Sequence, residues 1–505
     1  MFRSSHIIQL IYVFIIFSHI QCFAFGKNLP DNFAALDNYL QSQFDAAGVP
    51  GGALVVVSKD KILHMRGFGI SGPDQRACTP RTLFLIGSTS KSFTALGIMQ
   101  LVEAGKLELD APVRRYLPWF RTSDSVASGQ ITVRHLLNQT SGFSTLEGLK
   151  DFANTDTSDE AVEKRLRALQ YLQLGSAPGK HFEYSNINYV ILGYLIQVVS
   201  GQSYSQYMEG HVFAPLAMRS SAATDKRSEA TDLATGYRYW FGKSIPATSL
   251  PYPKVLIPAG YLYTNAEDMG HYLMAHMSGG MFEGKSVLSS NGIDVLHSSS
   301  VPFGSRLRYA MGWIADTQDP RLYDHDGGLP HFASYMAIAP EEDWAVAILV
   351  NANSMSSERS VAAIGSQAVR ILRGKAPIAL ERDKFFPAVL MGLFVLFVIE
   401  FIIATWMIRR IRKWHAHPEL SPKNRCRWLL NAFVPLLSGS LPLLTIFIVL
   451  PVFENFYLPD LLMFAPDAGF LIMLNLVVAL VGGATCAYLT LAQFRHRDVD
   501  AISIA

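Results

Sequence analysis

Residues 83–96 read Leu83-Phe84-Leu85-Ile86-Gly87-Ser88-Thr89-Ser90-Lys91-Ser92-Phe93-Thr94-Ala95-Leu96 and contain a change from one backbone pattern to another. The apolar run that ends at Gly87 is typical of a buried strand. After it, apolar residues recur at helical spacing until Gly105, a residue that commonly ends a helix. The sequence therefore predicts that Ser88 lies at a helix N-terminus and that Lys91 follows one turn later on the same face.

This spacing suits nucleophilic catalysis. A serine hydroxyl is a poor nucleophile until a nearby base takes its proton, and an amine can be that base when burial keeps it neutral. The helix dipole and the free amides of the first turn also favour negative charge beside Ser88. The pattern alone is weak, because a second copy, Ser58-Lys59-Asp60-Lys61, occurs in an expected hairpin turn. The alternative interpretation of Ser88 is an ordinary N-cap serine with a solvated lysine.

The composition excludes several classes of function. The chain has 505 residues, of which 50% are hydrophobic and only 17% charged, with a net charge of +2. This composition indicates a globular part joined to a membrane part and gives no reason to expect a nucleic-acid partner. The four cysteines, Cys22, Cys78, Cys426 and Cys486, have no metal-binding spacing. We therefore expect no metal site, no other cofactor and no disulfide framework.

Residues 1–24 have the features of a secretory signal peptide. A single arginine precedes an apolar run of about ten residues, and the small residue Ala24 precedes the expected cleavage point. A lipoprotein signal that uses Cys22 is the alternative. In either case, the globular part that follows is expected outside the cytoplasm.

Extended segments are predicted near both ends of residues 25–374, and the sequence between them is mostly helical. The pattern implies an α/β (α+β) fold in which one mixed sheet is built from both chain ends, with a helical insertion as a second subdomain. The expected strands cover residues 53–57, 62–68, 333–339 and 345–350, and the expected helices cover residues 28–48, 131–142, 151–174, 189–199 and 361–372.

The C-terminal part is predicted to cross the membrane three times. After a linker at 375–385, the apolar segments 386–408, 429–452 and 468–491 are each long enough to span a hydrocarbon core of about 30 Å. Residues 409–427 contain seven Lys or Arg, which marks this loop and the tail 492–505 as cytoplasmic. We therefore expect a multi-pass protein of the cell (inner) membrane, with residues 25–374 on the periplasmic or extracellular side.

Glu400 is the one charged residue within the first predicted span. An ionisable group at this depth usually faces other helices or a wet cavity. One interpretation is a protonated carboxyl group bonded to a neighbouring span. The other is a polar lining where a substrate or a lipid reaches the outer domain.

Two further patterns supply partners for Ser88 and Lys91. In Glu183-Tyr184-Ser185-Asn186, the Tyr184 hydroxyl can relay a proton to a leaving group, and Asn186 can bind a substrate amide. In His325-Asp326-Gly327-Gly328, the paired glycines allow a substrate to lie against a strand edge, with the Gly328 amide directed at its carbonyl group.

With these motifs, the sequence resembles the serine hydrolases related to class C β-lactamases and low-molecular-weight penicillin-binding proteins. That family has Ser-x-x-Lys, Tyr-x-Asn and Lys-Thr-Gly or His-x-Gly in this order, and the resemblance covers about residues 30–372. It implies a serine β-lactamase-like fold, with an antiparallel sheet flanked by helices and a helical subdomain. His325 stands where true β-lactamases have lysine, which is similar to the esterase and D-aminopeptidase branches. The matching residues are Ser88, Lys91, Tyr184, Asn186, His325 and Gly327.

The architecture resembles the membrane-bound D-amino-acid peptidases of nonribosomal peptide pathways, of the colibactin-maturation type. This resemblance implies a small peptide or acyl-D-amino-acid substrate, cleaved in a precursor. Within the family, an esterase or a peptidoglycan D,D-peptidase is the alternative. A receptor that stays acylated is the alternative from another class. The sequence leaves the oligomeric state open, with a homodimer among the options.

The mechanism that the resemblance implies is acyl transfer to Ser88. A neutral Lys91, together with Tyr184, accepts the Ser88 proton, and Tyr184 returns it to the leaving amine. The amides of Ser88 and Gly328 hold the oxyanion. His325 is expected to orient the substrate or to stabilise the Tyr184 anion.

Overall fold

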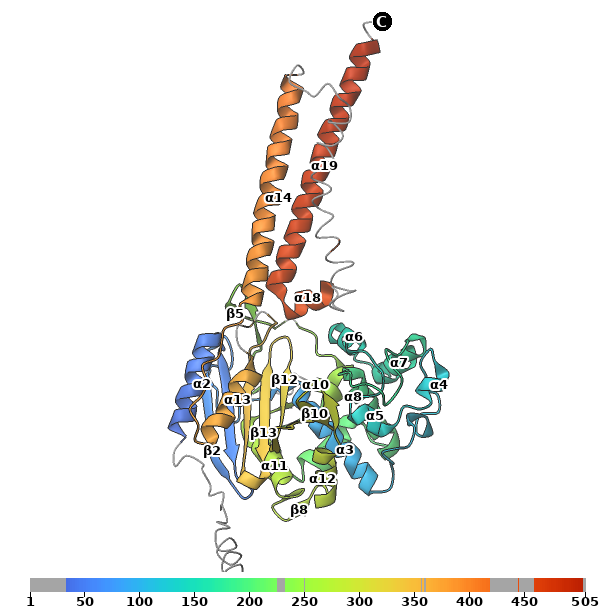
Figure 1. Ribbon diagram of the computed structural model, residues 1–505, viewed down its shortest axis with the longest axis vertical. Coiled ribbons are helices and arrows are strands. Elements are labelled where there is room, and N and C mark those ends of the chain that lie inside the picture. Colours follow the sequence, from blue (N-terminus) through green and yellow to red (C-terminus); the bar gives the residue numbers. More distant parts are fainter. Residues whose placement is uncertain are drawn as a thin grey trace, which may run out of the picture.

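The computed structural model describes residues 33–224, 232–248, 250–355, 357, 360–417, 444 and 458–502. The predicted signal peptide, residues 1–24, lies outside them. The globular part is built on one eight-stranded sheet, and long helices extend from it (Figure 1). The strand order is β2-β1-β14-β13-β12-β11-β10-β9. These strands are β1 Gly51–Val57, β2 Ile62–Gly69, β9 Val301–Phe303, β10 Leu307–Ala310, β11 Trp313–Asp316, β12 Asp319–Gly328, β13 Ala333–Ala339 and β14 Trp344–Val350.

The two ends of the globular part meet inside this sheet, where β1 pairs with β14 and places Leu54 opposite Ile348. Both strands are buried along their whole length, which explains why they are continuous apolar runs rather than alternating ones. The sheet built from both chain ends is therefore confirmed. The expectation of a mixed sheet is wrong, because every pair in this sheet is antiparallel, as the family resemblance implied. Short turns join most neighbouring strands, and a tight connection of this kind fits only antiparallel pairs.

Helices cover both faces of the sheet. On one face, α2 (Ala34–Ala47) and α13 (Val361–Leu372) bury their apolar stripes against β1, β13 and β14. On the other face, α11 (Ala266–Met277) packs against β1 and β14. The predicted helix at 361–372 is thus confirmed, and the helix predicted at 28–48 begins at Ala34 within the described residues.

Most of the insertion between β2 and β9 forms the helical subdomain, whereas α11, from the same insertion, lies on the sheet. Helix α8 of this subdomain is buried along most of its length and packs against α3, α5, α6 and α10. The helices are α3 Ser90–Glu103, α4 Ser125–Ser128, α5 Val133–Leu137, α6 Thr145–Leu149, α7 Ala161–Ala168, α8 Asn186–Ser200, α9 Tyr204–Met208, α10 Ile257–Gly260 and α12 Ser290–Ser298. Short two-stranded pairs join β3 Phe84–Leu85 to β6 Tyr263–Thr264, β4 Tyr237–Trp240 to β5 Lys243–Pro246, and β7 Met281–Phe282 to β8 Lys285–Ser286.

The prediction of a single helix over residues 151–174 is wrong. The segment contains a 3-10 turn at Lys150–Ala153, α7, and a second 3-10 turn at Leu169–Tyr171. Two side chains turn the backbone between them: Asn154 Oδ1 accepts from the Asp156 amide, and Asp156 Oδ1 accepts from the Ser158 amide, both at 2.9 Å. Such local bonds compete with helical ones and break the segment.

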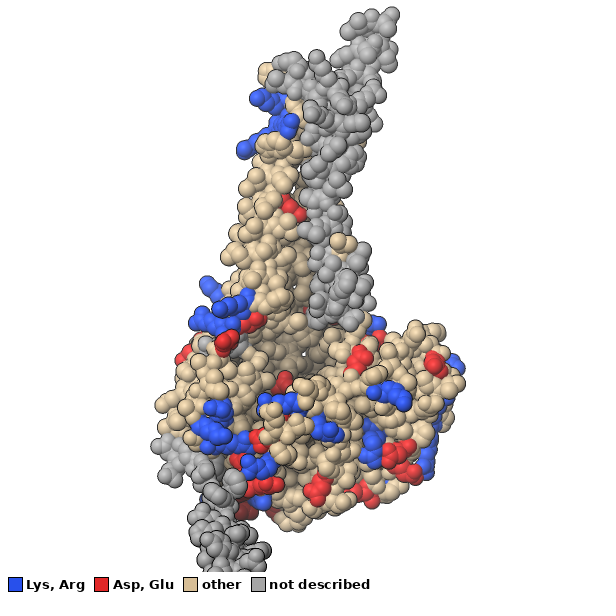
Figure 2. Space-filling view, in the orientation of Figure 1, with Lys and Arg blue, Asp and Glu red and all other residues tan. Residues whose placement is uncertain are grey.

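Two helices among the described residues are long and apolar enough to cross a membrane, where the sequence predicts three spans. They lie within α14 (Phe385–Ala416) and α19 (Pro466–Ile502), which run side by side away from the globular part (Figure 1). The predicted span 429–452 lies outside the described residues. Lys and Arg gather at both ends of α14, and the surface between them is almost free of charge (Figure 2). At the far end they belong to Arg409, Arg410, Arg412 and Lys413.

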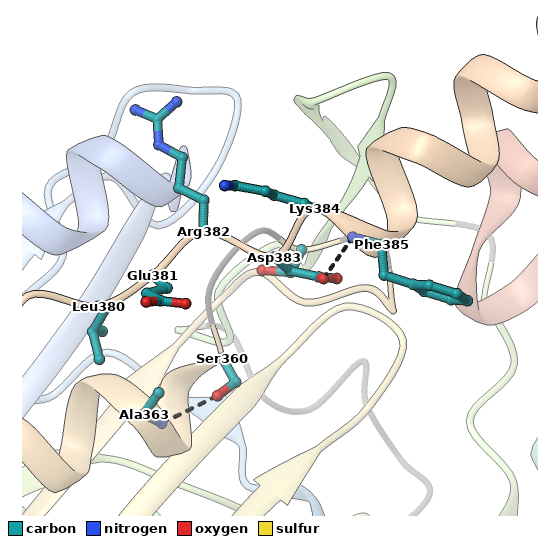
Figure 3. A pocket seen from close by; sticks show the side chains of 9 residues that line it. Ser360, Ala363, Leu380, Glu381, Arg382, Asp383, Lys384 and Phe385 are labelled. Atoms are coloured by element: carbon teal, nitrogen blue, oxygen red, sulfur yellow. Dashed lines mark hydrogen bonds between the residues drawn. The ribbon is translucent and has the colours of Figure 1, made fainter.

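The linker ahead of α14 passes beside the first turn of α13, where a cavity of about 690 Å³ opens (Figure 3). Asp383 Oδ1 accepts from the Phe385 amide at 2.9 Å in the turn just before α14, whose N-cap position is Lys384. Ser360 Oγ accepts from the Ala363 amide at 3.1 Å and caps the N-terminus of α13. Both helices that meet at this cavity thus begin at a defined residue.

A short helix, α18 (Leu458–Phe464), precedes α19 and contacts the globular part. The Phe464 carbonyl accepts from Ser354 Oγ and from the Met355 amide, both at 2.8 Å. The Phe464 ring packs edge-on against Phe152 at a centroid distance of 4.9 Å. The two parts of the chain are therefore in direct contact at this residue.

Candidate active site

Ser88 lies in the single 3-10 turn Gly87–Thr89 between β3 and α3. Thr89 Oγ1 and Ser334 Oγ both donate to the Ile86 carbonyl, at 2.7 and 2.6 Å, and so hold the turn against β13. The Ser88 side chain is half-buried, whereas its neighbours in the turn are buried. The prediction that Ser88 lies where a strand passes into a helix is confirmed.

Lys91 is fully buried, and its amine has three oxygen neighbours. Nζ lies 3.1 Å from Ser88 Oγ, 2.7 Å from Asn186 Oδ1 and 2.6 Å from the Ala259 carbonyl oxygen. Burial lowers the Lys91 pKa well below its usual value, and the charge of Asp326 only partly opposes this. A neutral amine has two N–H groups and one lone pair. Because the Asn186 and Ala259 oxygens only accept, they take the two hydrogens and leave the lone pair for the Ser88 hydroxyl.

Tyr184 completes a chain of three polar groups. Tyr184 and Ser88 line the same cavity and interact through their hydroxyl groups, and the Tyr184 ring centroid lies 4.8 Å from Lys91 Nζ. Burial raises the Tyr184 pKa well above its usual value, and the interaction with Ser88 only partly opposes this. The phenol is therefore protonated at rest. This order of pKa values makes Lys91 the base toward Ser88 and leaves Tyr184 to pass a proton on.

Asn186 contacts both Lys91 and the backbone of the helical subdomain. Its Oδ1 accepts from Lys91, and its Nδ2 donates to the Gly148 carbonyl at 3.2 Å. Each end of the side-chain amide thus has one protein partner, and these contacts position the Lys91 amine. The second N–H of Nδ2 is not used by either contact, so the predicted contact with a substrate amide stays a prediction. Its place on the first turn of α8, beside α6, creates this arrangement.

Gly327 and Gly328 lie at the end of β12, directly against the Ser88 turn. A Cβ atom on Gly87, which has a positive φ of 55°, would lie 2.6 Å from the Gly328 nitrogen. A Cβ atom on Gly327 would lie 2.0 Å from the Ile86 carbonyl oxygen. Only glycine at these positions lets the strand approach so closely. The Gly328 amide consequently lies beside Ser88, which agrees with the predicted role of these two amides in holding an oxyanion.

His325 is 3% exposed and lies on β12 beside the same cleft. Its Nδ1 is 2.5 Å from the Asp326 carbonyl oxygen, while Nε2 has no hydrogen-bond partner among the residues that the structure describes. Burial lowers the His325 pKa, so the ring is neutral and its protonated Nδ1 donates to that carbonyl. Nε2 then remains an acceptor for a substrate group or for Tyr184, whose ring centroid is 6.5 Å away.

A cavity of about 310 Å³ opens onto these groups. One side is aromatic: Phe182 stacks on Phe303 at 4.8 Å, and Tyr309 lies edge-on to Tyr184 at 6.0 Å. The sequence analysis missed five of the lining residues. Asp326 and Phe182 adjoin recognised motifs and could have been found from them, whereas the β9–β11 residues carry no local signal. The lining residues are Ser88, Phe182, Tyr184, Phe303, Tyr309, Ile314, His325, Asp326 and Gly328.

The second Ser-x-x-Lys copy forms no site. The Ser58 amide donates to the Lys61 carbonyl at 2.9 Å in the hairpin turn, and the Lys61 side chain is exposed. Within the described part of the chain, no group of three or more His, Cys, Asp or Glu could hold a metal ion. The described cysteines, Cys78 and Cys486, are buried free thiols.

A comparison with known families agrees with this geometry, because the model of the Beta-lactamase family matches residues 36–369. The chain belongs to the Beta-lactamase family. It is therefore a serine hydrolase related to β-lactamases and penicillin-binding proteins, and the matched region contains every residue of the site described above.

Several known proteins are similar to the chain. Protein flp of Staphylococcus aureus strain MW2 is 28% identical over 393 residues, which are 76% of this chain and 76% of that protein. The teichoic acid D-alanine hydrolase of Staphylococcus aureus is 31% identical over 244 residues, 47% of this chain and 56% of the relative. The octameric penicillin-binding protein homologue from Pyrococcus abyssi has a similar structure, with a TM-score of 0.59, 26% identity, and coverage of 68% of this chain and 78% of that one.

Proposed function

We propose that this family member is a membrane-anchored peptidase or amidase that forms an acyl-enzyme on Ser88 and cleaves bonds next to a D-amino acid. The observation that carries the proposal is the contact of 3.1 Å between Lys91 Nζ and Ser88 Oγ, in which a buried amine faces a hydroxyl. A base of this kind activates serine without a histidine–carboxylate pair.

The reaction proceeds in two acyl transfers. The Ser88 oxygen attacks the substrate carbonyl carbon while its proton passes to Lys91 Nζ. The resulting oxyanion is held by the Ser88 and Gly328 amides, and the proton travels through the Tyr184 hydroxyl to the leaving nitrogen. The C–N bond then breaks and leaves an ester on Ser88. Water then attacks the ester carbonyl carbon and gives its proton to Lys91. Lys91 passes that proton to the Ser88 oxygen as the ester bond breaks, and the acyl group leaves as a free acid.

Support for a D-amino-acid substrate comes from the family. The teichoic acid D-alanine hydrolase is named for hydrolysis that involves D-alanine. The apolar C-terminal helices suggest an anchored enzyme, like the peptidases that remove an N-acyl-D-amino-acid cap from exported precursors. We propose this precursor maturation, of the colibactin-maturation type, as the finer function, and an esterase or peptidoglycan D,D-peptidase as the alternative.

The experiment compares the purified full chain on three substrate types: N-acyl-D-asparagine amides, peptidoglycan stem peptides and p-nitrophenyl esters. Faster cleavage of the acyl-D-amino-acid amides supports the peptidase. Activity on the esters alone would refute it. A Ser88→Ala variant must be inactive in every case.

The receptor that stays acylated is the other class of function. Such a protein reacts once and then stops, whereas an enzyme releases many products for each Ser88. Counting the product formed per molecule of protein separates them, and a count that stays at one would favour the receptor. We propose that the catalytic cleft lies on the periplasmic or extracellular side, with the lipid bilayer around α14 and α19.

A further inference from the structure

The cavity at Ser88 has one carboxylate among its lining residues, and this group has no assigned role. Asp326 lies on β12 between His325 and Gly327, and its side chain is exposed at the rim of the cleft. It forms no ion pair or side-chain hydrogen bond with any residue that the structure describes. The remaining lining residues are aromatic, aliphatic, serine, glycine and histidine.

The charge of Asp326 reaches the reacting groups. Burial is the largest influence on the pKa values of Lys91, Tyr184, His325 and Tyr309, and the charge of Asp326 acts on each of them as well. Burial keeps Lys91 and His325 neutral, so neither of them compensates the Asp326 charge. The resting cleft therefore has a net negative charge next to the nucleophile.

We propose that Asp326 selects substrates by charge: the cleft favours an ammonium group beside the scissile bond and disfavours a free carboxylate there. The inference rests on the proposed hydrolase function and narrows its substrate class. An acyl-D-amino-acid amide without a free carboxylate fits the cleft, and a D-alanyl ester with its free amine fits better. A stem peptide that ends in a carboxylate, or a β-lactam that carries one, fits poorly.

The physical basis is simple attraction and repulsion in a cleft that excludes part of the water. A charge a few ångströms from Asp326 changes the stability of the bound state enough to alter kcat/KM by about tenfold. Because the Asp326 carboxylate is exposed to solvent, the dependence of kcat/KM on substrate charge must become smaller as the salt concentration rises. A merely structural Asp326 would produce no such dependence on substrate charge.

The test uses two matched substrate series on the full chain. In one, acetyl-D-alanine is coupled to ethylenediamine, glycinamide or glycine, which gives a positive, neutral or negative leaving group. In the other, the p-nitroanilide of D-alanine carries a free amine, an acetyl group or a succinyl group. In at least one series we expect kcat/KM to fall about tenfold from the positive to the negative member. The isosteric Asp326→Asn variant should remove most of this difference.

The Asp60→Asn variant is the control, because it removes one exposed carboxylate in the β1–β2 turn, outside the cavity lining. It should keep the wild-type charge preference. The inference is overturned when Asp326→Asn keeps the same ratio of kcat/KM values as wild type in both series.

A binding measurement separates this inference from the proposed function. Phenylboronic acids that carry an aminomethyl group, no group or a carboxylate bond to a nucleophilic serine without any turnover. If no amide or ester is cleaved, the proposed function fails, but the order of the three Kd values still reports on Asp326. Equal Kd ratios in wild type and Asp326→Asn would reject the charge selection.

Discussion

Lys91 Nζ lies 3.1 Å from Ser88 Oγ, and its other two contacts are with oxygens that only accept hydrogen bonds. This pairing needs a neutral amine, and full burial provides one by lowering the Lys91 pKa. The serine is thus prepared for attack before a substrate arrives.

Replacing Lys91 by Met removes the base and leaves the volume of the side chain nearly unchanged. We expect kcat to fall by about 10²–10⁴-fold, the usual contribution of a positioned base. The melting temperature near neutral pH should hold or rise, because the unfolded chain binds a proton at Lys91 that the folded chain does not. The Lys61→Met variant, in the exposed second copy of the motif, should keep full activity. Equal effects of the two substitutions would contradict the assignment.

Replacing Tyr184 by Phe separates amide from ester hydrolysis. An amine leaving group needs a proton from Tyr184, whereas p-nitrophenolate leaves without one. We expect the variant to lose about 10²–10³-fold in amide cleavage and far less in p-nitrophenyl ester cleavage, as measured by kcat/KM for matched substrates. A uniform loss on both substrates would show that Tyr184 does not act through the leaving group.

The pH profile should respond to a charge placed beside Lys91. Activity requires the neutral amine, so kcat/KM rises with pH through the Lys91 pKa. Asn186→Asp puts a carboxylate at the contact of 2.7 Å, favours the ammonium form and should move the rising limb about 1–3 units to higher pH. Asn186→Ala, which adds no charge, should not move it upward. If the rise of kcat/KM occurs at the same pH in Asn186→Asp as in wild type, a group other than Lys91 controls it.

The contact between α18 and the globular part predicts a stability effect at a distance from Ser88. Phe464→Ala removes the ring that packs against Phe152, and we expect a cost of about 2 kcal/mol because the ring is only partly buried. Thermal unfolding of the full chain in detergent measures it. Leu462→Ala, on the exposed side of the same helix, is the matched control and should have little effect. Identical melting temperatures of the two variants would refute the contact.

Two hydrogen bonds and two neighbouring residue pairs connect Phe464 with Gly328 in the cleft. Ser354, which bonds to the Phe464 carbonyl, follows Asn353, whose Nδ2 donates to the Leu329 carbonyl at 2.8 Å. Leu329 is the residue after Gly328. Activity assays of the Phe464→Ala variant therefore accompany the melting experiment.

The sequence predicts the parts of the site that local spacing determines. Ser88 and Lys91 are neighbours because one helical turn separates them, and Tyr184 directly precedes an apolar helix that was recognised. The contact of Asn186 with Lys91 could not be predicted, because it depends on how α8 packs against α3 and α6. Phe303 and Tyr309 enter the cavity from separate strands, so no local pattern brings them together with Phe182.

The fold, like the site, could be predicted only where a local sequence pattern determines it. β1, β13 and β14 are apolar runs buried on both faces, and such runs are visible in a sequence. The break in residues 151–174 depends on single side chains, Asn154 and Asp156, whose preference for turns is weaker than the helical pattern around them. The contact made by Phe464 joins residues more than 300 positions apart, and nothing local indicates it.

The most direct test of the account is intact-protein mass spectrometry of the full chain after brief mixing with a slowly released acyl donor. The account predicts a single acyl adduct, which peptide mapping assigns to Ser88 and which disappears as product forms. The Ser88→Ala variant should carry no adduct and release no product. An adduct on another residue, or continued hydrolysis by Ser88→Ala, would contradict the central claim.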